Sequence, residues 1–316
     1  TWRRREKLNI DYLGFFISVI FISGFVLGFM EAPNWGWTSL PIMGLFLLSI
    51  ISLITFIGWE KKIPHPLVEL TLFKNLTFTT LFSVLLIIQA VAIVFVFLAI
   101  FLQNVLHYSP LMAGLLLLPA MVPIMLMAPV GGHLRDKYGP TLPMFCGALL
   151  VVLSLIWIAI FSHNRGYAWL FPGLLVYGIG MPLILSGIMA TVMNMVNAQQ
   201  RGMASAIFNC ARQFGNTIGL ALLTGLLASV NKWQLNSFLH HSPVPLSRLK
   251  EQQIDGLLVQ SDQAMKAIAH LSLAHIELLK TAALNAYTNA FSMTLLAAAI
   301  LAFLSLFLIL KIPRKQ

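Results

Sequence analysis

The sequence predicts an all-α protein with eight transmembrane helices, and three observations lead to this fold class. Hydrophobic residues make up 59% of the 316-residue chain, charged residues only 9%, and the mean hydropathy is +0.86. Soluble domains carry about a quarter charged residues, so this chain has too little polar surface to stay in water. Apolar runs long enough to cross a bilayer as helices recur along it. No run alternates apolar and polar residues as the strands of a transmembrane barrel do.

The apolar runs place the helices. A helix needs about 20 predominantly apolar residues to cross the hydrocarbon core of a membrane. We expect spans at residues 12–30, 40–58, 76–103, 110–131, 142–162, 168–195, 203–230 and 286–310. Tryptophans gather at the span ends, where the amphipathic indole ring favours the membrane interface. They are Trp2, Trp35, Trp37, Trp59, Trp169 and Trp233.

Two prolines divide the chain into two parts. Residues 1–66 hold a basic segment and two helices, and they end at WEKKIPHPLVEL, where Pro64 and Pro66 discourage helix. Residues 67–316 hold six helices with short connections, apart from a polar segment at 232–284. We expect amphipathic helices lying on the membrane surface in that segment.

The net charge of +10 indicates an orientation rather than a nucleic-acid partner. If the RRREK stretch lies in the cytoplasm, the short connections on the opposite side hold only Arg165 and Lys232. This asymmetry obeys the positive-inside rule. The sequence therefore predicts cytoplasmic termini, an external segment at 232–284 and no binding of nucleic acid. The cytoplasmic cations are Arg3, Arg4, Arg5, Lys7, Lys61, Lys62, Lys74, Arg135, Lys137, Arg201, Lys311, Arg314 and Lys315.

No group of residues has the spacing of a catalytic or metal site. The eight histidines are scattered among connections, and His270 and His275 are too far apart to share a helix face. Cys146 and Cys210 lie in different spans and fit as small apolar filler. We therefore expect no enzyme activity, no metal and no cofactor. A channel is disfavoured as well, because the sequence has neither repeated pore rings nor a filter loop.

One polar stretch, GGHLRDKYGP at residues 131–140, interrupts the apolar runs. Its chemistry fits a tight turn between two spans. Gly131 and Gly132 tolerate close backbone approach and positive φ. Asp136 is placed to cap the helix that starts near residue 141, where a carboxylate meets free amides and the positive end of the helix dipole.

The same stretch resembles a motif of the major facilitator superfamily. The pattern Gly132-x-Leu134-x-Asp136-Lys137-x-Gly139 matches the loop that joins the second and third helices of each six-helix half in that family. Here it joins the second and third of the six helices in residues 67–316. Three more stretches are similar to the second half of the fourteen-helix drug/proton antiporters of the multidrug-resistance protein B type. They are PHPLVELTLFKNLTF, FLQNVLHYSPLMAGLLLLPAMVP and RGMASAIFNCARQFGNTIG.

That resemblance implies an activity and partners. The first two spans would be linker helices, six more helices would precede Thr1, and residues 67–316 would form a major-facilitator half-bundle. The chain would be the C-terminal part of a proton-driven multidrug exporter of the bacterial inner membrane that works by alternating access. Its partners would be a lipophilic small molecule, protons, the lipid bilayer, the missing N-terminal helices and, as a further candidate, a periplasmic membrane-fusion adaptor. Export of a siderophore or metabolite, and a non-transporting scaffold or receptor, are open alternatives.

Polar residues inside spans are the candidates for a substrate cavity, because they are costly in a membrane. Helix 203–230 carries a polar stripe, which serves either hydrogen bonding between helices or a cavity wall. The stripe consists of Ser205, Asn209, Arg212, Gln213 and Asn216. Beside it runs a ridge of small residues that allows close packing, formed by Ala204, Ala211, Gly215 and Gly219.

In the family the first, second, fourth and fifth helices of each half line the cavity. Two methionines one turn apart offer adaptable thioethers, although such pairs are common in ordinary cores. We expect substrate contacts from Gln89, Phe97, Gln103, Met121, Met125, Asn209, Arg212, Gln213 and Asn216. The resemblance implies a conformational role for the loop residues Gly132, Arg135, Asp136, Lys137 and Gly139.

The carboxylates are placed at the edges of the spans. No Asp or Glu lies deep in any of them, and Asp11 and Glu31 stand at the ends of the first. Proton-driven export needs a titratable carboxylate that is exposed to each side in turn, and the family places the principal ones in its first half. We therefore expect this chain to hold half of a substrate site and none of the main coupling residues.

Overall fold

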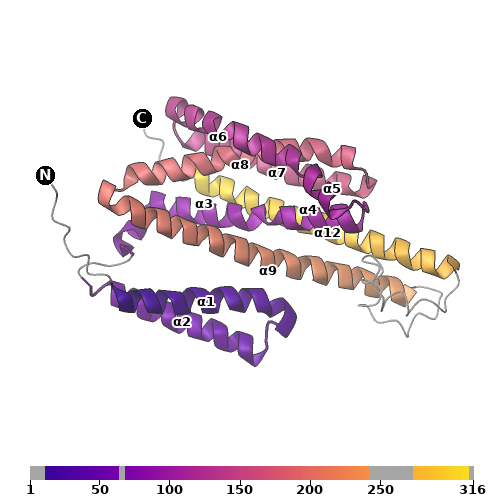
Figure 1. The fold of residues 1–316 in the computed structure, drawn as a ribbon, viewed down its shortest axis with the longest axis horizontal. Helices are drawn as coiled ribbons and strands as arrows, with labels where there is room; N and C mark the ends of the chain where they lie inside the picture. Colours follow the sequence, from indigo (N-terminus) through magenta and orange to yellow (C-terminus); the bar gives the residue numbers. More distant parts are fainter. Residues whose placement is uncertain (1–10, 64–67, 242–272, 313–316) are drawn as a thin grey trace.

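A computed structural model of the chain describes residues 11–63, 68–241 and 273–312 (Figure 1). The regular secondary structure of these residues is helical, with no strand among them. Eight helical stretches are long and apolar enough to cross a membrane, which confirms the predicted all-α fold with eight spans. The spans are Tyr12–Ala32, Leu40–Glu60, Leu76–Asn104, Pro110–Tyr138, Thr141–Asn164, Tyr167–Met195, Arg201–Phe238 and Ile276–Leu310.

The first two spans form an antiparallel hairpin that lies beside the other six (Figure 1). Helix α1 covers Tyr12–Trp35 and α2 covers Leu40–Glu60. The carboxylate of Asp11 joins the start of α1 to the end of α2. It caps α1 by accepting from the amide of Gly14 at 2.9 Å, and it accepts from the indole N–H of Trp59 at 3.1 Å.

The other six spans form a bundle. Two of them are interrupted, one at Ile93 and the other at Leu117. Beside Leu117, Pro119 has no amide proton to donate, and the carbonyl of Leu116 accepts from the hydroxyl of Tyr167 at 2.8 Å. The bundle contains α3 (Leu76–Ala92), α4 (Val94–Asn104), α5 (Pro110–Leu116), α6 (Leu118–Tyr138), α7 (Thr141–Phe161), α8 (Tyr167–Met195), α9 (Arg201–His241) and α12 (Leu273–Leu310). The hairpin meets the bundle mainly through α1, which packs on α9.

Small residues set the closest approaches between helices. A Cβ built on Gly219 of α9 would lie 2.3 Å from the carbonyl oxygen of Ala90 on α3. Ala204 and Ala211, on the same face of α9, are fully buried. The predicted close packing of the small-residue ridge is therefore confirmed, and its partner is α3. Without a hydrophobic drive in lipid, such close backbone contact is what holds two spans together.

The turn expected at residues 131–140 is shorter than predicted. Helix α6 continues to Tyr138, so the turn consists of Gly139 and Pro140, and the positive φ of +78° falls on Gly139. The expected cap is wrong as well, because α7 has no side-chain cap and the exposed Asp136 pairs with Arg135 instead. A continuing helix satisfies its own backbone hydrogen bonds, and two residues suffice to reverse the chain.

Part of the segment 232–284, which we expected outside the spans, continues the helices of the two neighbouring spans. Helix α9 runs to His241 and α12 begins at Leu273, so the two ends of this segment extend the spans. The surface helices expected between them fall on residues 242–272, which lie outside the described residues.

Most described cations gather at one end of the molecule. Helices α2, α6, α8 and α12 end there, and α3, α7 and α9 begin there (Figure 1). We call this the basic end, and its described cations are Lys61, Lys62, Lys74, Arg135, Lys137, Arg201 and Lys311. The opposite end holds Arg165, Lys232 and Lys280 among the described residues.

Candidate functional site

The polar stripe of α9 lies on an open flank of the bundle. The side chains of Asn209, Arg212 and Gln213 are exposed and that of Asn216 is half-buried. The opposite flank of α9 meets the hairpin, since the ring of Phe214 lies 5.2 Å from that of Phe25, measured between centroids. The stripe therefore points away from the hairpin and away from the ridge that packs on α3.

Exposed polar side chains inside a membrane span need a polar environment. Hydrocarbon cannot hydrogen-bond an amide or a guanidinium, and side chains of this kind in spans face a protein interior or a water-filled cavity. Two spans of the bundle are less covered than the rest. In their most apolar stretches 11% of the residues are buried in Pro110–Tyr138 and 22% in Arg201–Phe238, against 44–56% in the other four. Helices α6 and α9 are thus the open flanks of the bundle.

The methionine pair lies on the other open flank. Met121 and Met125 of α6 are 38% and 77% exposed. Helix α6 packs on α8, whereas α9 packs on α3 and α12, and α6 and α9 run along different sides of the bundle (Figure 1). The structure therefore does not close the methionines and the α9 stripe into one pocket. Each offers a separate wall.

The three expected contacts from the first helix of the bundle are not on an open surface. Gln89 and Phe97 are only 6% and 3% exposed. Gln89 lies at the crossing of α3 and α9, where a Cβ built on Gly215 would be 2.9 Å from its Cβ. Gln103 is partly buried, and its amide donates to the carbonyl of Ala99 at 3.1 Å. Helical spacing showed which residues share a face, but the neighbouring helix that covers that face came only with the tertiary structure.

The buried carboxylate of the described chain lies at the basic end. Glu60, the last residue of α2, is 3% exposed, and its carboxylate accepts from the amide of Val68 at 3.3 Å. Its carboxylate therefore holds the connection between the hairpin and the bundle, and it lies at the end of a span rather than in its middle. Within the described residues, no group of three or more His, Cys, Asp or Glu side chains could hold a metal ion.

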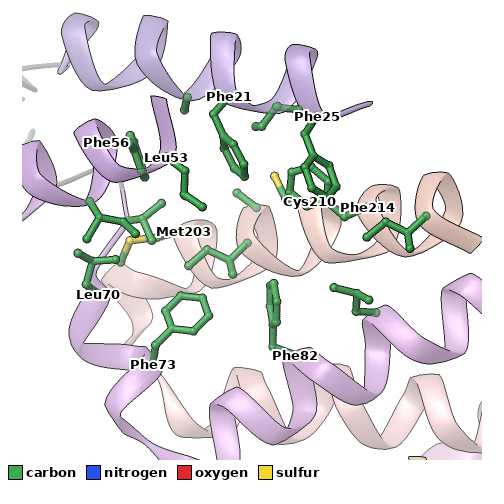
Figure 2. Close-up of a pocket in the computed structure, with 18 residues that line it drawn as sticks. Phe21, Phe25, Leu53, Phe56, Leu70, Phe73, Phe82, Met203, Cys210 and Phe214 are labelled. Atoms are coloured by element: carbon green, nitrogen blue, oxygen red, sulfur yellow. The ribbon is translucent and has the colours of Figure 1, made fainter. Parts of the chain in front are cut away.

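Sequence reasoning missed an apolar pocket of about 600 Å³ between the hairpin and the bundle (Figure 2). Phe21 and Phe25 of α1 reach into it from one side, and Phe73 and Phe82 from the other. Phe21, Phe25 and Phe29 recur every four residues along α1 and so share one face of it. The helix that this face meets, α9, is distant along the chain and was not predictable from spacing.

Comparison with known proteins places this fold among transporters. The profile of the Major Facilitator Superfamily matches residues 3–220. The chain is 30% identical over 242 residues to Multidrug resistance protein Stp of Mycobacterium tuberculosis, covering 76% of this chain and 45% of that protein. It is 24% identical over 318 residues to Multidrug transporter protein MdtP of Bacillus subtilis, covering 95% and 59%.

A third relative, the Tetracenomycin C resistance and export protein of Streptomyces glaucescens, is 27% identical over 218 residues, or 67% of this chain and 40% of that protein. The chain spans about half the length of the curated relatives it matches. A bacterial homologue of the human lysosomal transporter Spinster, crystallised in an inward-facing and occupied conformation, shares the fold. Its TM-score is 0.55 at 13% identity, covering 93% of this chain and 66% of that one.

Proposed function

Because the chain belongs to the Major Facilitator Superfamily, we propose that it forms one wall of the substrate cavity of a proton-driven exporter of lipophilic drugs. It is a multi-pass membrane transporter of the drug-antiporter branch and not an enzyme. Relatives named for multidrug and tetracenomycin C resistance support substrates of the lipophilic antibiotic class.

The exposed polar stripe of α9 carries this proposal. Asn209, Arg212 and Gln213 stand uncovered in a helix that is apolar enough to span the membrane. They offer donors and acceptors on a surface that lipid cannot satisfy, as a water-filled cavity shared with further helices requires. Met121 and Met125 lie on the separate open flank of α6, where we assign them adaptable apolar contacts with substrates of different shapes, apart from the α9 stripe.

We propose that the cavity opens to the two sides of the membrane by alternating access. In that mechanism two helical bundles rock about a central site and expose it to each side in turn. The described spans have no Asp or Glu away from their ends, so we assign the proton-coupling carboxylate to helices that share the cavity with this chain.

Efflux of a lipophilic dye from cells tests this function. We expect the full-length protein, expressed from its complete gene in cells deprived of their own exporters, to lower the accumulation of ethidium. A protonophore should restore accumulation to the level of cells with an empty vector, because it removes the proton gradient. Efflux that persists with the protonophore would contradict proton coupling. Unchanged accumulation of ethidium and of several lipophilic antibiotics would favour a metabolite or siderophore exporter.

We also propose that the basic end lies in the cytoplasm and that the segment Gly132–Gly139 moves during transport. The excess of cations at this end supports the orientation. The exposure of Asp136 and Lys137 supports the conformational role, because Asp136 pairs only with the adjacent Arg135 and both side chains can reach a partner that changes between states.

A single cysteine at position 137 is expected to report both properties. In a variant with the native cysteines replaced, Lys137→Cys should react with a membrane-permeant maleimide and not with an impermeant one added to intact cells. In inverted vesicles its labelling rate should change several-fold when a transported dye is added. Ala198→Cys, exposed at the same end but outside the motif, should be labelled from the same side at a constant rate. Labelling of position 137 from outside would reverse the orientation, and a rate indifferent to the dye would reduce the segment to a turn.

A further inference from the structure

The pocket between the hairpin and the bundle has an apolar lining. Eighteen residues from α1, α2, α3, α9 and the connection before α3 surround it (Figure 2). The hydroxyl of Ser18 is the exception among their side chains, and it already donates to the carbonyl of Phe15 at 2.7 Å. Pockets for drug-sized molecules combine apolar walls with a few convergent polar groups that orient the ligand. No hydroxyl of this lining is free to orient a polar ligand, so the pocket suits a hydrocarbon chain.

The position of the pocket also favours lipid. The helices that line it are apolar enough to span a membrane, so we expect the hydrocarbon of the bilayer to reach its opening. The hairpin touches α9 through aromatic rings, with Phe21 and Phe25 at 5.6 and 5.2 Å from Phe214 between centroids. Elsewhere the two parts stand apart and leave about 600 Å³. An empty gap of this size would cost the lining its dispersion contacts, which an acyl chain restores.

At the basic end, four cations lie close in sequence to residues that line the pocket. Phe56 and Ile57 of the lining are followed by Lys61 and Lys62, and the lining residue Phe73 precedes Lys74. Arg201 stands two residues before Met203, which also lines the pocket. All four cations are exposed, and the structure pairs none of them with a carboxylate among the described residues.

The neighbouring carboxylates are engaged elsewhere. Glu60 is buried and accepts from the amide of Val68. Glu69 accepts from the hydroxyl of Thr71 at 3.1 Å and from the side-chain amide of Gln200. The four cations outnumber these two carboxylates, so the surface at the basic end of the pocket carries a net positive charge. Because it adjoins the ends of spans, we expect it to meet lipid headgroups.

We propose that an anionic phospholipid binds here, with one acyl chain in the pocket and its phosphate among Lys61, Lys62, Lys74 and Arg201. The lipid comes from the leaflet at the basic end. Its chain fills the space between the hairpin and α9, and its headgroup meets the cations as basic residues meet anionic lipid surfaces. The bound lipid thus joins the hairpin to the bundle. The site is separate from the polar stripe of α9 and does not depend on the identity of the transported substrate.

Photocrosslinking with a phosphatidylglycerol that carries a diazirine in its acyl chain tests the site in the purified full-length protein. We expect crosslinks in the lining segments 18–25, 53–57, 68–86 and 203–218. Unlabelled phosphatidylglycerol should compete, and phosphatidylcholine of the same chains should compete much less. Ala206→Phe fills the pocket and should lower crosslinking several-fold. Ala228→Phe, at an exposed position on the same helix outside the lining, should leave it unchanged.

A charge variant keeps the proposal testable if Ala206→Phe fails to fold. The double variant Lys61→Gln and Lys62→Gln should lose most of the preference for phosphatidylglycerol, whereas Arg165→Gln with Lys280→Gln, which removes the same charge at the opposite end, should keep it. Crosslinks outside the four lining segments, equal competition by phosphatidylcholine in the wild-type protein, or preferential displacement by ethidium would each overturn the proposal. Displacement by ethidium would assign the pocket to substrate instead of lipid.

Discussion

Gly219→Ala is expected to force α9 away from α3 and to lower the stability of the bundle by about 1–3 kcal/mol, the usual cost of overpacking a tight contact. The added Cβ would lie 2.3 Å from the carbonyl oxygen of Ala90 and 2.5 Å from its Cα. Both are backbone atoms, so no side chain can rotate away to make room. The midpoint of thermal unfolding of the purified protein in detergent measures the effect.

Gly225→Ala is the matched control, six residues further along the same helix. A Cβ at Gly225 would meet nothing within 4 Å. Because Ala is favoured over Gly in a helix by about 1 kcal/mol, this change should leave the unfolding midpoint unchanged or raise it slightly. Equal midpoints for the two variants would show that α3 and α9 do not pack through Gly219 as described.

Arg212→Ala is expected to reduce drug efflux about ten- to a hundredfold while the amount of inserted protein stays the same. Its guanidinium is exposed and hydrogen-bonds no other described residue, so its removal leaves no buried group unpaired. In the proposed cavity it would make charge-assisted hydrogen bonds, whose loss costs about 1.5–3 kcal/mol. Each 1.36 kcal/mol corresponds to about tenfold in rate.

Two controls separate a role in the cavity from a role in folding. Arg212→Lys keeps the charge and should retain part of the efflux, whereas Lys280→Ala removes an exposed cation at the opposite end and should have no effect. The unfolding midpoint of Arg212→Ala should match that of the wild-type protein. If efflux were normal in Arg212→Ala, the stripe would serve contacts between helices and the assignment of the cavity wall to α9 would be lost.

The spans were predictable from sequence because a single physical requirement defines them locally. Each must present about 20 apolar residues to the hydrocarbon core, whatever surrounds it. The ridge of α9 was predictable for a related reason. Ala204, Ala211, Gly215 and Gly219 recur at helical spacing, and small residues on one face serve close packing in lipid.

Only the tertiary structure decided what each face meets. In the sequence, Gln89 and Asn216 are both polar residues inside spans. In the structure, α9 covers Gln89 of α3, whereas Asn216, which lies on α9 itself, stays half-buried. Periodicity could not show that Asp136 continues a helix and pairs with Arg135 instead of capping α7. The pocket under Phe21 and Phe25 escaped prediction because its walls come from helices far apart in the chain. Helical spacing is a property of one segment, whereas burial and cavities belong to pairs of segments, and only packing determines those pairs.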